Sequence, residues 1–272
     1  MADAGILYVA TGRRFARMAL LSIEHLRMVE PDVPVAIVTD AETEEAIRAG
    51  LPAGVATLPL RDPAYSWFDK IPGFRAAPFA RTLYLDADVI ALRPFFTDVM
   101  RLLDLAPMAA RSAGIAFNFP WETRDYPAAF PQYNTGVVAF DRARALPTLD
   151  RWEALRARGE ADGGGNQPTF RAALLESGIV PAELPAAYNF MEADGATEPV
   201  RLVHFVQSKA VLENPRRRAR RLAFLRDLET PCRVFHGGVL LDRRKTIPWR
   251  FLLTALRYTL AVRYKKIVGR WP

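Results

Sequence analysis

The chain has 272 residues, half of them hydrophobic, and a formal net charge of +7. This length fits one large domain or two small ones with a sizeable buried core. A single cysteine, Cys232, excludes an intramolecular disulfide. The first residues, MADAGILYVAT, lack the basic and apolar segments of a signal peptide, so we expect a cytoplasmic protein.

The positive charge is concentrated at the C-terminal end. Residues 243–272 contain nine Lys or Arg and no Asp or Glu, which leaves a net charge of −2 for residues 1–242. We therefore expect a main domain over 1–242 and a basic, aromatic helical tail over 243–272. Because the excess charge belongs to the tail, the main domain is not expected to bind nucleic acid.

The first third of the chain alternates between strand and helix patterns, which predicts an α/β fold with a parallel sheet. After residue 85 the order is less regular, which indicates a mixed second half. The predicted strands are 6–10, 35–38, 55–58, 82–85, 135–140, 201–206 and 232–235, and the predicted helices are 15–28, 41–49, 143–158 and 167–177. Residues 112–133 are predicted to form a loop over a site.

Two carboxylates, Asp86 and Asp88, follow the strand 82–85 in the stretch RTLYLDADVIALRPF. Aspartate is rarely buried unless it is paired or binds a metal. One interpretation is a solvated turn. The other is a site for Mn²⁺ or Mg²⁺, which prefer oxygen ligands, at the edge where open α/β sheets bind ligands.

Lys70, in the stretch WFDKIPGF, precedes this pair by sixteen residues. It is either a surface lysine or a charge that neutralises a diphosphate. Asn134 begins the stretch NTGVVAF, and Gly136 within it allows close approach of a ligand to the backbone. The alternative is a turn before a core strand.

Three glycines precede Asn166 and Gln167 at the start of a predicted helix. This pattern suits either a helix N-cap or an amide pair that contacts a polar substrate. Two histidines, His204 and His236, compete as a further metal ligand, and we favour His204 because Lys209 follows it closely.

These motifs occur in an order that resembles the GT-A glycosyltransferases, within them the retaining family typified by glycogenin and bacterial galactosyltransferases. The resemblance covers most of residues 5–210. It implies a Rossmann-like fold with a mixed central sheet flanked by helices. It also implies transfer of a sugar from a nucleotide-diphosphate donor to a saccharide or lipid-linked acceptor, and a UDP-sugar is the expected donor. The implied metal ligands are Asp86, Asp88 and His204.

The resemblance also implies roles for residues around the metal. Lys209 is similar to the lysine that holds the departing diphosphate, and Asn134 and Gln167 to polar residues that line the sugar pocket. The residues expected to be catalytic are Asn166, Gln167 and Lys209. The other residues expected to bind the donor are Thr11, Gly12, Asp40, Lys70, Ala87 and Gly136.

The chain departs from the family at Asn166, where the family usually has Asp. An amide cannot act as a base or as a carboxylate nucleophile. Tyr188-Asn189 replaces the usual Trp-Asn pair, and the Trp-containing motif that normally follows the diphosphate lysine is missing. These differences leave the stereochemical outcome and the sugar open.

Two other classes of function fit parts of the sequence. LYLDADV also resembles the nucleophile motif of haloacid-dehalogenase-type phosphatases, although there it usually opens the domain. A non-catalytic sugar-nucleotide-binding protein at a membrane surface is the other alternative. The basic, aromatic tail suits an anionic inner leaflet, and we expect peripheral attachment there.

Overall fold

The computed structural model describes residues 2–113, 127, 129–161, 165–191, 199–206, 209–226, 232–235 and 239–242. The chain divides into two compact units, Met1–Pro185 and Ala186–Pro272. The predicted tail, 243–272, and His236 lie outside the described residues.

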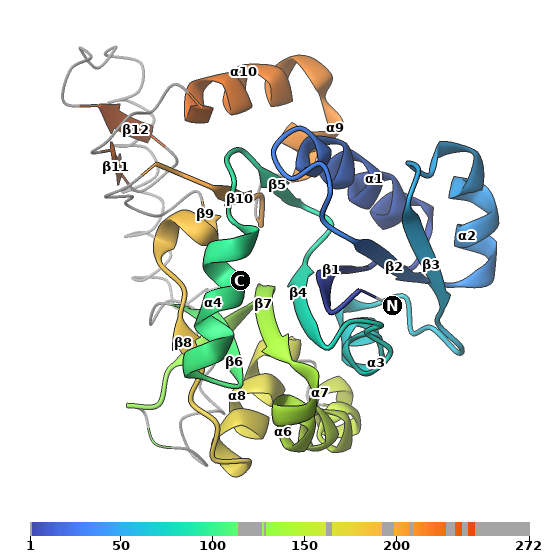
Figure 1. Cartoon of the computed structure of the whole chain (residues 1–272), viewed down its shortest axis with the longest axis vertical. Helices are drawn as coiled ribbons and strands as arrows, with labels where there is room; N and C mark the ends of the chain where they lie inside the picture. The colour runs from blue at the N-terminus through green and yellow to red at the C-terminus, as the bar shows by residue number, and fades with distance from the viewer. Residues whose placement is uncertain are drawn as a thin grey trace, which may run out of the picture. The chain divides into compact units, whose positions relative to one another are not determined.

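Among the described residues of the first unit, seven strands form one mixed sheet in the order β3-β2-β1-β4-β7-β6-β8 (Figure 1). The first four strands of this order run parallel, and β7 runs antiparallel to both β4 and β6. The strands are β1 Ala4–Val9, β2 Val35–Thr39, β3 Val55–Pro59, β4 Arg81–Leu85, β6 Met108–Ala113, β7 Gln132–Asp141 and β8 Ala182–Glu183. A short strand, β5 Val89–Ala91, follows β4.

The helices of the first unit follow from amphipathic segments bounded by turn residues. α1 begins after Gly12, whose φ of 79° suits glycine, and it buries Ala19, Ile23 and Leu26 on one face. Asp40 caps α2 by accepting a hydrogen bond from the backbone of Thr43. The helices are α1 Arg13–Arg27, α2 Ala41–Ile47, η1 Arg48–Gly50, η2 Trp67–Asp69, α3 Lys70–Arg75, α4 Phe96–Leu105, α6 Arg142–Ala154, α7 Arg156–Ala161 and α8 Asn166–Glu176.

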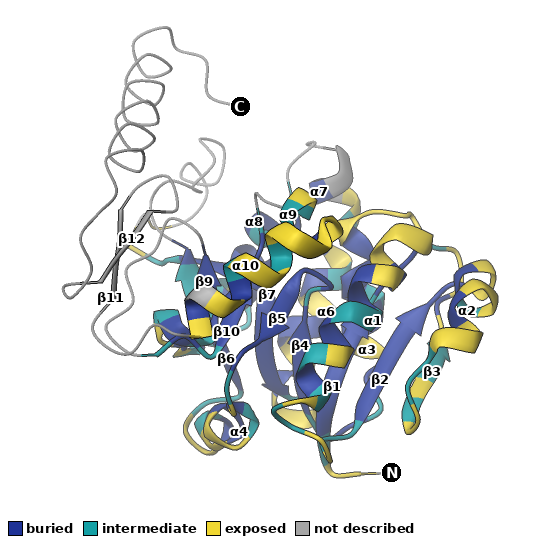
Figure 2. Cartoon of the chain, turned by 90° about the horizontal axis from the view of Figure 1, so that it is seen from above, coloured by how far each residue is buried: buried dark blue, intermediate teal, exposed yellow. Residues whose placement is uncertain are grey.

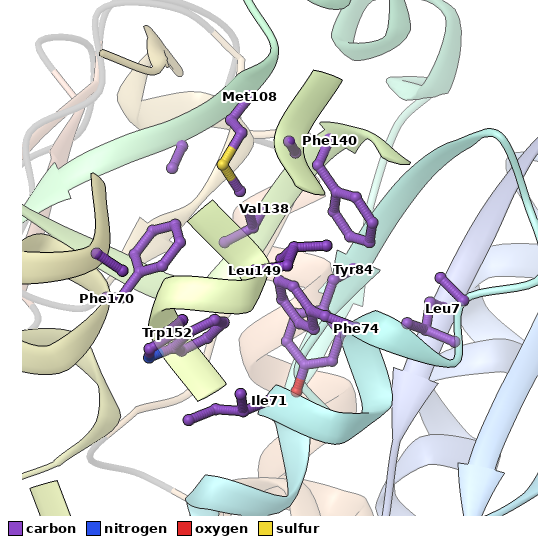
Figure 3. Packing of buried hydrophobic residues seen from close by; sticks show 14 of the residues in the cluster. Leu7, Ile71, Phe74, Tyr84, Met108, Val138, Phe140, Leu149, Trp152 and Phe170 are labelled. Atoms are coloured by element: carbon purple, nitrogen blue, oxygen red, sulfur yellow. The ribbon is translucent and has the colours of Figure 1, made fainter. Parts of the chain in front are cut away.

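The main core lies between one face of the sheet and the helices α3, α6 and α8 (Figure 3). The ring of Phe74 lies 4.6 Å from Tyr84, 5.1 Å from Phe140 and 5.3 Å from Trp152, measured between centroids. The indole N–H of Trp152 donates to Thr169 Oγ1 at 3.0 Å, so the buried polar atom is satisfied. This packing fixes α3, which carries Lys70, against the sheet.

α1 lies against the opposite face, where the Tyr8 and Ser22 hydroxyls share a hydrogen bond of 2.9 Å. Burial raises the pKa of Tyr8 above its usual range, so this phenol stays neutral. The central strands are buried, and much of α2 is exposed (Figure 2). Both faces of the sheet are therefore covered, as a largely parallel sheet requires.

The second unit contains short elements. β9 and β10 pair in parallel, and β11 and β12 pair antiparallel. Five of the six residues at 216–221 are arginines, and they lie on α10, which buries Leu222 and Leu225. The elements are η4 Ala186–Tyr188, β9 Phe190–Met191, β10 Leu202–His204, α9 Lys209–Glu213, α10 Pro215–Arg226, β11 Cys232–Phe235 and β12 Val239–Asp242.

The predicted α/β fold with a mixed, helix-flanked sheet is confirmed. Some elements differ from the prediction. The loop predicted at 112–133 overlaps the ends of β6 and β7, and the helix predicted at 143–158 is divided into α6 and α7 at Leu155. No helix in the described ranges is long and apolar enough to cross a bilayer.

Candidate active site

One edge of the central sheet collects the ends of β1, β2 and β4 and the beginning of antiparallel β7. Thr11, Asp40 and Asp86 follow the three parallel strands, and Asn134 lies near the start of β7. β2 and β3 lie on one side of β1, and β4 and β7 lie on the other. Such a reversal of strand order is where open α/β sheets bind ligands.

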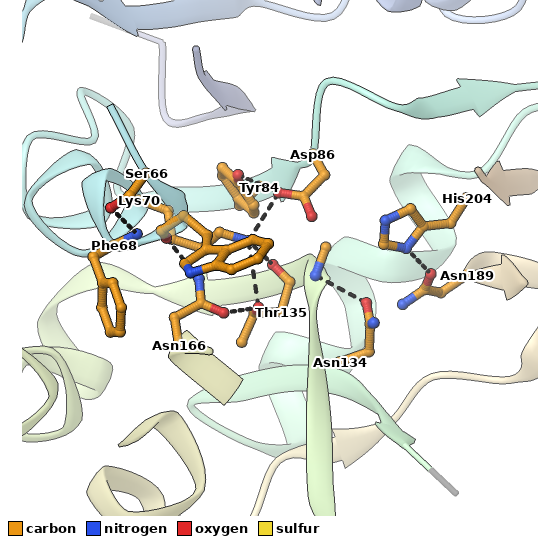
Figure 4. A network of polar contacts seen from close by, with 12 residues as sticks. Ser66, Phe68, Lys70, Tyr84, Asp86, Asn134, Thr135, Asn166, Asn189 and His204 are labelled. Carbon is orange, nitrogen blue, oxygen red and sulfur yellow. Dashed lines mark hydrogen bonds and ion pairs between the residues drawn. The ribbon is translucent and has the colours of Figure 1, made fainter. Parts of the chain in front are cut away.

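Asp86 is the centre of a polar network at this edge (Figure 4). Its Oδ1 accepts hydrogen bonds from Lys70 Nζ at 2.9 Å and from the Tyr84 hydroxyl at 2.5 Å. Its backbone N–H donates to the carbonyl of Gly136 at 2.7 Å, which ties the end of β4 to β7. The side chain of Asp86 keeps 25% of its surface exposed, and Asp88 is buried.

Lys70 is buried, which rules out the interpretation as a surface lysine. Its Nζ also donates to the carbonyl and the hydroxyl of Thr135, both at 3.3 Å. The ammonium therefore has three hydrogen-bond acceptors, which offset the cost of burying a charge. It supplies positive charge beside Asp86 before any ligand binds.

Tyr84 donates to Asp86 in its neutral form. Burial raises the pKa of Tyr84 well above its ordinary value of 10.0, and the negative charge of Asp86 raises it further. The phenol therefore remains a hydrogen-bond donor over the physiological pH range. It fixes the orientation of the carboxylate together with Lys70.

Thr135 links this network to the start of α8. Its hydroxyl donates to Asn166 Oδ1 at 3.0 Å, and Asn166 Nδ2 donates to the carbonyl of Trp67 at 2.7 Å. Asn166 is buried with both ends of its amide engaged, so it positions neighbouring elements. Gln167 is half-buried and accepts from Gln132 at 3.5 Å.

The end of β1 is held by a second carboxylate, Asp69. Thr11 Oγ1 donates to Asp69 Oδ2 at 2.6 Å. Asp69 is not among the residues predicted from the sequence, although the Ser66-x-x-Asp69 spacing is that of a capping box, which the structure contains. Thr11 is thereby fixed at the predicted donor edge.

Asp40 binds the turn after β1. Its Oδ2 accepts from the backbone of Gly12 at 3.1 Å, and its Oδ1 accepts from Thr43 at 2.9 Å. Burial acts to raise the pKa of Asp40, but hydrogen bonds from Thr43 and Gly12 outweigh it and hold the pKa below 3.8. Asn134 makes a similar local bond, because its Oδ1 accepts from the backbone of Gly136 at 2.9 Å.

In the second unit, His204 ends β10 and is buried. Its Nδ1 lies 3.0 Å from Asn189 Oδ1 (Figure 4). A partner at Nδ1 fixes the ring and favours Nε2 as a metal-binding atom. Lys209 is the first residue of α9.

Neither protein-family models nor curated proteins match this sequence. Solved structures do match. The galactosyltransferase LgtC, in complex with donor and acceptor sugar analogues, aligns with a TM-score of 0.60 at 14% identity over 92% of this chain and 99% of that one. Mouse xyloside xylosyltransferase 1 aligns with a TM-score of 0.52 at 12% identity over 91% of this chain and 100% of that one.

A third match is the glycosyltransferase GlyE from Streptococcus pneumoniae, with a TM-score of 0.54, 16% identity, and coverage of 76% of this chain and 55% of that one. At these identities the likeness concerns the fold. The mixed central sheet flanked by helices agrees with it. The chain therefore has the GT-A fold of glycosyltransferases.

Proposed function

We propose that this chain is a metal-dependent glycosyltransferase that moves a sugar from a nucleoside-diphosphate donor, with UDP-sugar as the first candidate, to a saccharide or lipid-linked acceptor. The observation that carries the proposal is the acidic pair Asp86 and Asp88 at the strand-order reversal of a GT-A fold. A ligand at this edge would have its anionic part beside Lys70.

The metal ligands in this proposal are Asp86, Asp88 and His204. Two carboxylates and an imidazole suit Mn²⁺, and Mg²⁺ also favours the oxygen ligands. When bound, the ion would supply positive charge to the diphosphate leaving group. Lys70 and Tyr84 orient Asp86 through one oxygen.

The donor would extend along the sheet edge. Thr11, Gly12 and Asp40 at the ends of β1 and β2 would face the nucleoside. Lys70 and Lys209 would face the diphosphate. The remaining donor contacts in this proposal are Ala87, Asn134 and Gly136. Asp40 already accepts hydrogen bonds from Gly12 and Thr43. It would therefore both hold this turn in shape and contact the ribose or base.

Asn166 and Gln167 would position the transferred sugar. Neither amide can accept a proton as a base or attack as a carboxylate nucleophile. Departure of the leaving group would therefore depend on charge neutralisation and positioning. We propose a retaining hexosyltransferase on the family resemblance, and the stereochemistry of the product tests this directly.

We further propose that residues 243–272 bind an anionic membrane surface at the cytoplasmic face, where a lipid-linked acceptor would be reached. The nine basic residues and the absence of acids support the proposal. Co-sedimentation of the full chain with anionic and with neutral vesicles tests it. Equal binding to both kinds of vesicle would contradict it.

The central experiment is a thermal-shift screen of UDP, GDP, CDP and ADP with MnCl₂ or with EDTA. A ligand that binds only the folded state raises the melting temperature. We expect one nucleotide to do so in MnCl₂ and not in EDTA, and Asp86→Ala and Asp88→Ala to abolish the effect. Asp150→Ala, at an exposed position on α6, is the matched control. Metal-dependent binding would be contradicted if the nucleotide raised the melting temperature equally in EDTA and in MnCl₂. It would also be contradicted if the nucleotide raised the melting temperature equally in the wild type and in both variants.

A further inference from the structure

Trp67 is unusually exposed for a tryptophan. Its exposed fraction is 65%, whereas the next residues, Phe68, Asp69 and Lys70, are all buried. Tryptophan is highly buried on average, and Trp152 in the core of the same unit is fully buried. The residues before it, Ala64 to Ser66, are exposed as well. An exposed indole next to a buried segment presents a large apolar surface to water at a free-energy cost.

The backbone that carries this indole is fixed on several sides. Ser66 Oγ accepts from the N–H of Phe68 at 3.2 Å, and Asp69 accepts from the N–H of Ala64 at 2.7 Å and of Ser66 at 3.3 Å. Tyr65 has a φ of 51°, in the left-handed region that costs free energy for a residue with a side chain. The segment that carries Trp67 is therefore held by hydrogen bonds and includes one residue in an unfavourable backbone conformation.

The backbone of Trp67 is also connected to the acidic site through a series of hydrogen bonds. Its carbonyl accepts from Asn166, which accepts from Thr135, which accepts from Lys70, whose ammonium binds Asp86. Each link in this series of hydrogen bonds measures 3.3 Å or less. The position of Trp67 is thereby set relative to the site residues on β4, β7 and α8.

The order of strands distinguishes two ends of the site. β2 and β1 lie on one side of β4, and β7 lies on the other. If the nucleoside lies at Gly12 and Asp40 and the diphosphate at Asp86, the sugar and the acceptor lie toward β7 and α8. Asn166, which holds the Trp67 carbonyl, begins α8.

We propose that Trp67 is the aromatic surface on which a saccharide ring of the acceptor rests. The face of an indole carries partial negative charge and attracts the weakly positive C–H groups of a pyranose ring. Its flat, rigid side chain gives a large contact area at low conformational cost. The proposal rests on the proposed function, because it assumes a sugar-nucleotide donor at Asp86.

The first test measures binding at Trp67 itself. The full chain is labelled with 5-fluorotryptophan, and the Trp67 fluorine signal is identified by its absence in Trp67→Phe. We expect methyl β-glycosides of glucose, galactose or N-acetylglucosamine to shift this signal saturably, and the Trp152 signal to stay in place. A Trp67 signal that none of the three glycosides moves would overturn the proposal.

The second test compares acceptor with donor. With UDP-glucose and UDP-galactose as donors, Trp67→Ala should raise the KM for the glycoside about tenfold or more, the factor that a loss of about 1.4 kcal/mol gives. The Kd for UDP in MnCl₂ should remain within about twofold of wild type, a change of under 0.5 kcal/mol. Trp67→Phe should fall between wild type and Trp67→Ala. Leu146→Ala, which removes exposed apolar surface on α6, is the control.

The outcomes separate the two proposals. If wild-type protein binds no nucleotide, the proposed function fails, and the fluorine signal still decides whether Trp67 binds a saccharide. If UDP binds normally but Trp67→Ala leaves the glycoside KM unchanged, the inference about Trp67 fails alone. If Trp67→Ala weakens UDP and glycoside equally, Trp67 is not an acceptor residue.

Discussion

Replacing Lys70 by Met tests whether the buried ammonium is the built-in counter-charge of Asp86. Methionine keeps an unbranched side chain and removes the charge that lies 2.9 Å from Asp86 Oδ1. Removing one member of a buried ion pair costs roughly 3–5 kcal/mol. We expect about 3 kcal/mol in the ion-free protein, at the lower end of that range, because 25% of the Asp86 side chain is exposed to water.

Mn²⁺ should restore most of the stability that Lys70→Met loses. Without Lys70, no ammonium competes for Asp86, so Mn²⁺ should bind the variant more tightly than the wild type. At a concentration of 100 times its Kd, the ion stabilises the folded state by about 2.7 kcal/mol, which offsets most of the loss. UDP should bind more weakly, because the site has lost a positive charge.

Urea denaturation in EDTA and in MnCl₂ gives the free energies of unfolding, and calorimetric titration gives the Kd values for Mn²⁺ and UDP. Arg75→Ala is the matched control on α3, since the Arg75–Asp150 pair is exposed and such pairs contribute about 1 kcal/mol at most. Two results would refute the proposal that Lys70 is the counter-charge of Asp86. One is an unchanged free energy of unfolding of Lys70→Met in EDTA, and the other is a parallel fall in its affinities for Mn²⁺ and UDP.

Three further outcomes follow from the same edge of the sheet. Tyr84→Phe removes the 2.5 Å hydrogen bond to Asp86 and should lower the free energy of unfolding by roughly 1.5–3 kcal/mol, measured by urea denaturation. Gly12→Ala places a Cβ at a φ of 79° and a ψ of 143°, a conformation that residues with a side chain rarely adopt, and should cost about 1–3 kcal/mol in the same assay. Unchanged stability would contradict this expectation. The pKa of Asp40 is lower in the folded than in the unfolded chain, so its stabilisation is present above about pH 4 and is lost as the pH falls through the folded pKa. In Asp40→Asn the free energy of unfolding should therefore fall less steeply as the pH drops below about 4. A pH dependence equal to that of the wild type would contradict this assignment.

Hydrophobic periodicity was sufficient to predict the parallel half of the sheet. Val35–Thr39 and Arg81–Leu85 are short runs of apolar and β-prone residues, and their ends placed Asp40 and Asp86 at one edge. β6 was missed because its sequence, MAARSA, contains no β-branched or aromatic residue. It forms a strand because β7 pairs with it, which is a tertiary effect.

The partners within the site could not be predicted from spacing. Lys70 was recognised as a candidate, but its burial and its bonds to Thr135 depend on how α3 packs against the sheet. Asn166 was predicted to contact substrate, and the structure shows its amide holding Thr135 and the backbone of Trp67. The sequence pattern identifies which polar residues belong to the site. Which of them form hydrogen bonds with one another depends on how distant segments of the chain pack.

The antiparallel placement of β7 has a consequence for the order of folding. The edge around Asp86 requires β1, β4 and β7, which are far apart in the chain and pair only after two long loops have closed. Such non-local pairings form slowly, because closure entropy is lost before the contacts are gained. During synthesis, Lys70 and Asp86 emerge well before Thr135 and Gly136. The polar network should therefore be among the last parts of the first unit to form, and its completion would report that the whole sheet has assembled.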